Sequence, residues 1–319
     1  MYFENKEEKK NALELILAPM EGITDLPFRI LCLEKGADIV FTEFIAAPQL
    51  ISGTKDALQK IRILSDKGIT GVQIYGKDPE QMALAAKIAS DSGAKVLDLN
   101  FGCSTRKVTS HGCGSALLKD LDHVEKIISS VVQASSLPVS VKTRLGARIE
   151  EPNYIDNFLR AQELGIAAFC LHGRGGNEKY NVKSRWEPIH KLLTHPGCRI
   201  PIIGNGDLFT PEDVVEKYNS GFSKLMIGRG VIGNPWIFAQ SKKLYTRQNT
   251  EEVSIAERLQ TVCRHLELNL KYKASEELAV REIRKHYDNY LRNWEDWISL
   301  RPSIMRAERA DDVFSILGK

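Results

Sequence analysis

The sequence predicts an α/β protein, namely a (β/α)8 TIM barrel followed by a small all-helical C-terminal domain. Three observations support this fold class. Eight short apolar runs recur along the first three quarters of the 319 residues, helical patterns lie between several of them, and no strand pattern follows Trp236. A doubly wound open sheet is the main alternative, but no G-x-G-x-x-G motif follows the first apolar run.

The eight expected strands are short and rich in β-branched or other apolar residues. Most are nearly continuous rather than alternating, which is typical of parallel strands covered on both faces. The expected strands are residues 15–19, 38–44, 70–76, 95–102, 139–145, 167–174, 200–207 and 224–230.

Helix signals separate several of these strands. They are clearest in residues 79–93, 120–136 and 211–221. The first of these segments stops at Gly93, a residue suited to the end of a helix. Asp120 or Asp122 is a suitable N-cap for the second, and Thr210 for the third. Alternation of strands and helices indicates a parallel sheet.

Beyond the eighth strand the pattern is helical. Val280, Ile283 and Tyr287 keep a 3.6-residue period, which predicts a helix with one apolar side. We therefore expect residues 1–241 to form the barrel domain and residues 242–319 to form the helical domain.

Composition restricts the class of protein. The 44 Lys and Arg residues against 41 Asp and Glu give a net charge of +3, which neither indicates nor excludes binding to nucleic acid. The six cysteines contain no C-x-x-C pair, so we expect reduced thiols rather than a metal site or disulfide framework. The N-terminal segment is charged and no apolar stretch is long enough to span a bilayer, which predicts a cytoplasmic protein.

One connection is much longer than the others. LDLNFGCSTRKVTSHGCGSALL, residues 97–118, begins like a buried strand and continues into a loop with two cysteines, three glycines, two basic residues and a histidine. In a barrel, the loops that follow the strands build the active face. The extra length at this end therefore favours a functional loop.

Polar residues and glycines collect where the expected strands end. The glycines after the seventh and eighth strands suit a phosphate, because backbone N–H groups and a helix N-terminus supply donors, and Arg229 adds a bidentate partner. The residues at these strand ends are Pro19, Met20, Gln73, Asn100, Cys103, Lys142, His172, Arg174, Asn205, Gly206, Asp207, Gly228 and Arg229.

Each of these residues, taken alone, has a structural explanation. Gly206 and Gly228 could serve tight turns, and Lys142 could be a solvated residue at a strand tip. His172 could be a hydrogen-bonded structural histidine, and Cys103 an inert small side chain. The functional interpretation depends on their coincidence at one end of one barrel.

From about residue 15 to about residue 310 the chain resembles the tRNA-dihydrouridine synthases. The N-x-G-C loop, followed by a glycine-rich run and A-L-L, is specific to that family, whereas A-P-M, N-G-D and I-G-R are shared among flavin barrels. Ser104 stands where the family usually has proline, and Gly175 and Gly176 stand where it often has Arg-Thr or Lys. The matching segments are LILAPMEGITDLPFR, GVQIYG, LDLNFGCSTRKVTSHGCGSALL, VSVKTRLG, LHGR, IPIIGNGD, LMIGRGVIGNPW and REIRKHYDNYL.

The resemblance implies an FMN enzyme that reduces the C5=C6 bond of a uridine in tRNA, with NADPH or NADH as electron donor. A cation beside the flavin would stabilise its reduced form, which gives Lys142 a role. The resemblance implies that the residues holding FMN are Pro19, Met20, Glu21, Gln73, Lys142, His172, Asn205, Gly206, Asp207, Gly228 and Arg229.

The resemblance also implies that Cys103 is the catalytic acid that delivers a proton to uracil C5. A thiol with an ordinary pKa near 8.5 is mostly protonated at neutral pH. Asn100 and Arg174 are expected at the uracil carbonyls, and Arg106 and Lys107 are expected at RNA phosphates.

The helical domain is the expected grip on tRNA, since a stacked uridine must be swung out of the RNA to reach a flavin. Arg281, Lys285 and Arg292 fall on the side of one helix opposite its apolar stripe. A solvated charged face is the alternative explanation. We expect a monomer that uses tRNA and NAD(P)H and holds no metal.

Two other functions remain open from the sequence. A flavin oxidoreductase of free pyrimidines, like a dihydroorotate or dihydropyrimidine dehydrogenase, would share the flavin site but have no use for a basic helical tail. A barrel aldolase would use Lys142 as a Schiff base and would be colourless.

Overall fold

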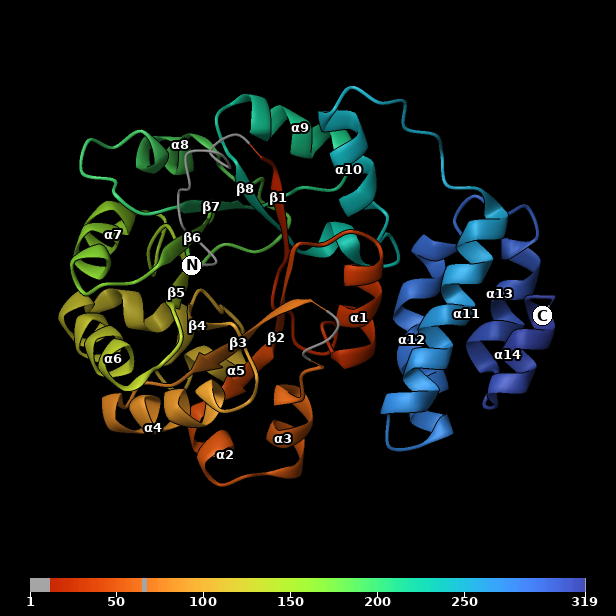
Figure 1. Ribbon diagram of the computed structural model, residues 1–319, viewed down its shortest axis with the longest axis horizontal. Helices are drawn as coiled ribbons and strands as arrows, with labels where there is room; N and C mark the ends of the chain where they lie inside the picture. Colours follow the sequence, from red (N-terminus) through yellow and green to blue (C-terminus); the bar gives the residue numbers. More distant parts are fainter. Residues whose placement is uncertain (1–11, 65–67, 319) are drawn as a thin grey trace.

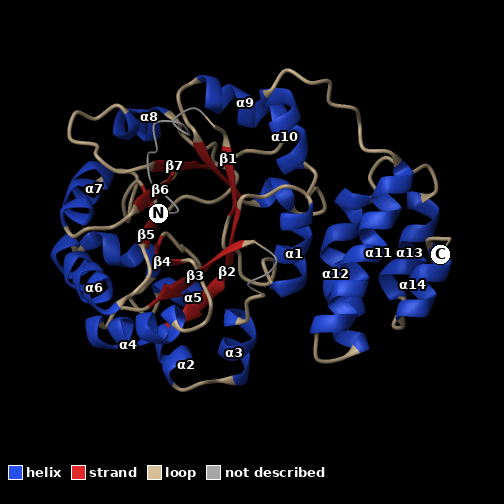
Figure 2. Ribbon diagram, viewed as in Figure 1, coloured by secondary structure: helices blue, strands red, loops and turns tan. Residues whose placement is uncertain are grey.

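The computed structural model of the chain describes residues 12–64 and 68–318. Eight parallel strands follow one another around a closed barrel, in which β1 pairs with β8 as well as with β2 (Figures 1 and 2). The strands are β1 (Glu14–Leu17), β2 (Ile39–Ala46), β3 (Ile69–Tyr75), β4 (Val96–Phe101), β5 (Val139–Arg144), β6 (Ala168–His172), β7 (Ile202–Asn205) and β8 (Lys224–Ile227). The barrel expected from the sequence is confirmed, and every expected strand overlaps an observed one.

Helices cover the outside of the barrel (Figure 2). Asp120 caps α6 by accepting from the His123 backbone, and Thr210 forms a capping box with Asp213 at the start of α9. The barrel helices are α1 (Leu26–Glu34), α2 (Ala47–Ile51), α3 (Lys55–Ile61), α4 (Pro79–Ser90), α5 (Arg106–Thr109), η3 (Gly114–Lys119), α6 (Leu121–Ala134), α7 (Tyr154–Glu163), α8 (Glu187–Leu193), α9 (Pro211–Asn219), η4 (Arg229–Val231) and α10 (Ile237–Tyr245).

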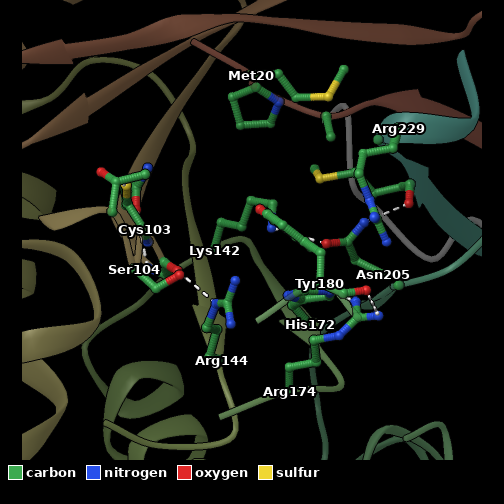
Figure 3. A pocket seen from close by; sticks show the side chains of 18 of the residues that line it. Met20, Cys103, Ser104, Lys142, Arg144, His172, Arg174, Tyr180, Asn205 and Arg229 are labelled. Carbon is green, nitrogen blue, oxygen red and sulfur yellow. Dashed lines mark hydrogen bonds between the residues drawn. The ribbon is translucent and has the colours of Figure 1, made fainter. Parts of the chain in front are cut away.

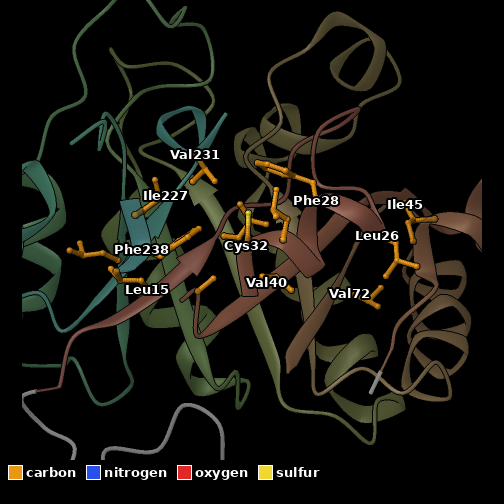
Figure 4. Packing of buried hydrophobic residues seen from close by; sticks show 14 of the residues in the cluster. Leu15, Leu26, Phe28, Cys32, Val40, Ile45, Val72, Ile227, Val231 and Phe238 are labelled. Atoms are coloured by element: carbon orange, nitrogen blue, oxygen red, sulfur yellow. The ribbon is translucent and has the colours of Figure 1, made fainter. Parts of the chain in front are cut away.

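Alternation along each strand divides the apolar side chains into an inner and an outer set. Along β1, Leu15 and Leu17 belong to the large outer cluster, whereas Ile16 belongs to a smaller inner one. Figure 4 shows part of the outer cluster, where side chains of the strands face those of α1 and α10. Inside the barrel, Phe41 lies so close to Gly71 that a Cβ there would meet its ring at 2.3 Å. Each large apolar side chain that is fully buried contributes about 1.5–3 kcal/mol to stability, so both clusters stabilise the barrel.

The C-terminal part of the chain is a helical bundle beside the barrel (Figure 1). Its apolar stripe is confirmed, since Val280, Ile283 and Tyr287 are fully buried. Within the described residues, no helix is long and apolar enough to cross a membrane. The helices of the bundle are α11 (Ile255–Tyr272), α12 (Glu276–Tyr290), α13 (Trp297–Arg306) and α14 (Ala310–Ile316).

The bundle contacts the barrel mainly through α1. Asp25, the N-cap of α1, forms an ion pair of 2.5 Å with Lys273, and Lys35 at the other end of α1 pairs with Glu257 at 3.0 Å. The division expected at residues 241 and 242 falls inside α10, which packs on α9 of the barrel. We therefore propose residues 246–254, the extended connection before α11, as the division between the two parts.

Candidate active site

A cavity of about 810 Å³ opens at the carboxyl ends of the strands. Its lining includes residues from, or directly after, all eight strands. Every residue that the sequence suggested for the cofactor is among them, together with Asn100, Cys103 and Arg174. In the view of Figure 3, Lys142 lies between Cys103 on one side and Asn205 and Arg229 on the other.

Strand geometry explains why these side chains meet. Residues two apart on a strand face the same side, so the inward positions of each strand form levels inside the barrel. Lys142 is level with Asn100 in the pairing of β4 with β5, and His172 is level with Asn205 in the pairing of β6 with β7. These polar residues occupy inward positions at or near the carboxyl ends of their strands, above the apolar inner cluster. The open end of the barrel is therefore polar while its interior is apolar.

A chain of hydrogen bonds runs from the barrel interior to the Cys103 loop. The Gln73 side-chain amide donates to Asp98 Oδ2 at 2.6 Å, and Gln73 Oε1 accepts from Asn100 Nδ2 at 2.8 Å. Asn100 Oδ1 in turn accepts from the backbone N–H groups of Gly102, at 3.0 Å, and Cys103, at 2.8 Å. Asn100 thus fixes the backbone that carries the thiol, while its expected contact with a uracil carbonyl stays a prediction.

Further contacts hold the Cys103 loop in place. Arg144 Nε donates to the Gly102 carbonyl at 2.8 Å, and Ser115 donates its backbone N–H to the Cys103 carbonyl at 2.9 Å. Gly114 has φ +62°, and a Cβ on it would lie 2.4 Å from that carbonyl oxygen. The part of the loop around Gly114 and Ser115 therefore packs tightly against Cys103. Cys103 Sγ is half-buried and lies 3.2 Å from the Thr105 hydroxyl.

Lys142 and His172 form the floor of the cavity. Lys142 Nζ donates to Asn205 Oδ1 at 3.0 Å, and Asn205 Nδ2 donates to the Met226 carbonyl at 2.7 Å. Burial, followed by the positive charge of Lys142 and three arginines, holds the pKa of His172 well below its ordinary value. His172 is therefore neutral, and since its Nε2 lies 3.0 Å from Arg174 Nη1, that nitrogen is the acceptor.

Arg174 is a buried support of the cavity wall. It is 1% exposed and binds Asp207 through Nη2, at 2.8 Å to Oδ1 and 2.6 Å to Oδ2, while its Nε donates to the Val182 carbonyl. Burial alone would raise the pKa of Asp207, but the hydrogen bond from Arg174 lowers it. Asp207 also accepts from Arg229 Nη2 at 2.9 Å. The expected contact between Arg174 and a uracil carbonyl stays a prediction.

The rim after β7 and β8 is built for close approach to a ligand. Gly206 has φ +138°, a conformation that favours glycine, and a Cβ there would lie 2.1 Å from Ser184 Oγ. Within residues 12–64 and 68–318, no acceptor is found for the backbone N–H groups of Gly228, Arg229 and Gly230, which open the short helix η4. Unpaired N–H groups at such a turn attract anions, so this rim suits a phosphate.

Arg144 and Tyr180 are among the lining residues that the sequence analysis missed. Arg144 is 3% exposed and follows Lys142 by two positions on β5, a spacing that could have indicated its inward direction. Tyr180 comes from the loop after β6 and is 57% exposed, with the Arg229 guanidinium 4.5 Å from its ring centre. No periodic signal marks Tyr180, because its position depends on the path of an irregular loop.

The expected RNA-contacting residues lie outside the cavity. Arg106 and Lys107 are exposed on α5, directly after the Cys103 loop. Arg281 is exposed on α12 and lies 3.7 Å from Glu277, whereas Lys285 donates to the backbone carbonyl of Gly22 in the loop after β1. Their expected roles at RNA stay predictions.

The comparisons with known proteins agree with the sequence motifs. The family described as "Dihydrouridine synthase (Dus)" matches residues 16–315. The tRNA-dihydrouridine synthase B of Shewanella oneidensis is 34% identical over 95% of this chain and 94% of its own length. The corresponding proteins of Vibrio cholerae, 35% identical, and Proteus vulgaris, 37% identical, cover the same shares of both chains. The chain therefore belongs to the dihydrouridine synthase family.

Proposed function

We propose that this chain reduces the C5=C6 double bond of uridines in tRNA to 5,6-dihydrouridine, using FMN and NADPH or NADH. The observation that carries the proposal is the position of Cys103 on a tightly held loop in the same cavity as the anion-binding rim and the polar floor. Family membership supports the reaction, an oxidoreduction of a CH–CH bond, and names of the relatives support tRNA as the substrate.

The cavity residues fit FMN. The free N–H groups of Gly228, Arg229 and Gly230 would bind its phosphate, and Gln73 and Lys142 would bind the pyrimidine part of its ring system. When bound, FMN supplies the hydride for the reduction. Lys142 would place a positive charge where negative charge gathers on reduction, which favours that state.

Cys103 holds the proton that the reaction consumes. A hydride added at uracil C6 leaves negative charge towards the C4 carbonyl, and a proton is then needed at C5. The proton passes from Sγ to C5, and a thiolate remains. Asn100 and Arg144 hold the backbone on the N-terminal side of Cys103, so the thiol is oriented before the base enters.

The proposed RNA contacts lie on two sides of the cavity. Arg106 and Lys107 are on the loop that carries the thiol, and Arg281 and Lys285 are on the bundle helix α12. The contact of Lys285 with Gly22 places α12 beside a loop that lines the cavity. With tRNA as substrate, we propose a cytoplasmic enzyme that acts as a monomer.

The alternative of a dehydrogenase for free pyrimidines is not favoured. It would account for the phosphate-binding rim and Lys142, but not for the bundle, which the family match includes. The aldolase alternative needs a Lys142 amine free to attack a carbonyl, whereas Lys142 Nζ is hydrogen-bonded to Asn205 in a cavity that fits FMN.

The test is replacement of Cys103 by alanine, with Cys113→Ala on the same loop as the matched control. Cys113 is buried, with its Sγ directed at the His111 carbonyl. We expect Cys103→Ala to keep bound FMN and its reduction by NADPH but to lose nearly all dihydrouridine formation, measured by mass spectrometry of tRNA. Cys113→Ala should keep both. Normal uridine reduction by Cys103→Ala would exclude the acid role.

A further inference from the structure

Asp98 is a buried acid beneath the cavity that the proposed reaction does not use. It lies on an inward position of β4, is 1% exposed, and is absent from the cavity lining. Its Oδ1 accepts from Ser140 Oγ at 2.5 Å, and its Oδ2 accepts from the Gln73 side-chain amide at 2.6 Å. A buried carboxyl is costly unless its partners are well placed, so a purely apolar packing role does not explain it.

The Asp98 carboxyl fixes the direction of the Gln73 amide. Asp98 Oδ2 accepts from the Gln73 amide, so the NH2 group of Gln73 faces Asp98 and its oxygen faces away. This direction holds for the ionised carboxylate and for a carboxyl whose proton is on Oδ1. The oxygen then meets Asn100 Nδ2 at 2.8 Å, which directs Asn100 Oδ1 to the backbone N–H groups of Gly102 and Cys103. Reversing either amide would place donor against donor along this chain.

We propose that Asp98 is a positioning residue that orients Gln73 and, through Asn100, fixes the backbone of the catalytic Cys103. The proposal rests on the proposed function for the role of Cys103, and on the four hydrogen bonds for the connection. Asp98 does not line the cavity, so we do not expect it to touch substrate or cofactor. It acts through the side chains of Gln73 and Asn100, which are both buried. Hydrogen bonds in such a buried chain reinforce one another.

Gln73 faces the cavity with a defined chemistry as a consequence. One N–H of its amide is used by Asp98, which leaves the second N–H for a ligand in the cavity. The orientation imposed by Asp98 therefore predicts that Gln73 donates to the bound ring rather than accepting from it. The direction of the Gln73 amide and the position of the Cys103 backbone therefore both depend on Asp98.

The test compares Asp98→Leu, which removes the acceptor, with Asp98→Asn, whose amide oxygen can still accept from Gln73. Ser140→Ala is the matched control, because it removes the other hydrogen bond of the same carboxyl. The full-length enzyme with its bound cofactor is used. Hydrogen exchange of the Gly102 and Cys103 amides is measured, since these are the N–H groups that Asn100 protects.

We expect exchange of these two amides to be at least tenfold faster in Asp98→Leu, and within threefold of the wild type in Asp98→Asn and Ser140→Ala. The kcat for dihydrouridine formation should fall about tenfold in Asp98→Leu with little change in KM. If Asp98→Leu does not fold, Gln73→Met interrupts the same chain of hydrogen bonds at the next residue. It should accelerate hydrogen exchange of the Gly102 and Cys103 amides to the same extent. Unchanged exchange in the folded variant would overturn the proposal, whereas absence of dihydrouridine formation by the wild type would overturn only the proposed function.

Discussion

The burial of Asp98 also predicts how the stability of the protein depends on pH. Burial raises the pKa of Asp98 from 3.8 to about 7, against the lowering effect of the hydrogen bonds from Gln73 and Ser140. Between pH 4 and pH 7 the folded protein therefore keeps a proton that the unfolded chain releases. Because the native state binds more protons in this window, the free energy of unfolding falls as pH rises through it and is constant above about pH 7.

The magnitude follows from the width of the window. Each pH unit between the two pKa values changes the free energy of unfolding by about 1.4 kcal/mol. Over the range from pH 5 to pH 7 the contribution of Asp98 is therefore about 2–3 kcal/mol. Asp98→Asn removes this titration, and its amide can satisfy both neighbours by accepting from Gln73 and donating to the Ser140 hydroxyl.

The assay is urea unfolding of the wild type and Asp98→Asn at a series of pH values from 5 to 8. The buried His265, whose pKa burial lowers to about 4, titrates with the opposite sign, because the unfolded chain takes up the proton below its ordinary pKa of 6.5. His265 is common to both proteins and cancels in the difference. We expect the variant to gain about 2–3 kcal/mol relative to the wild type between pH 5 and pH 8. Two parallel curves would refute the assignment of the raised pKa to Asp98.

Two further predictions concern the Cys103 loop and the bundle. Gly114→Ala should lower dihydrouridine formation at least tenfold with FMN retained, because the added Cβ would displace the Cys103 carbonyl. The control Gly112→Ala has a similar φ but its Cβ would meet no atom closer than 3.7 Å, so it should cost only about 1 kcal/mol of stability. Equal activities of the two variants in a tRNA assay would contradict this prediction. Arg281→Glu with Lys285→Glu should weaken tRNA binding and reduce the slope of log K against log salt by about one per lost phosphate contact. Arg309→Glu, at the N-cap of α14, should leave the slope unchanged, and equal effects at both places would exclude α12 as a specific contact.

Much of the cavity could be predicted from the sequence because strand ends are local features. Lys142, His172 and Asn205 each lie at the end of a recognisable apolar run, and the closure of the barrel brings such ends together. Arg144 could have been predicted in the same way, because side chains two residues apart on a strand face the same side and Lys142 is two residues before it. The domain division was less accessible, because α10 continues the helical pattern of the tail while packing on the barrel.

The sequence by itself determined the barrel, the helical bundle, and the set of chemical groups at the strand ends, because periodicity, capping and strand direction are properties of neighbouring residues. Only the tertiary structure decided how those groups are used. Asn100 and Arg174 are both expected at the uracil carbonyls, and the structure gives each a different partner within the protein: Asn100 holds the backbone of the thiol loop, and Arg174 binds Asp207. Such assignments depend on hydrogen-bond partners that are distant along the chain, and a buried donor or acceptor must take whichever partner the closed barrel brings within about 3 Å.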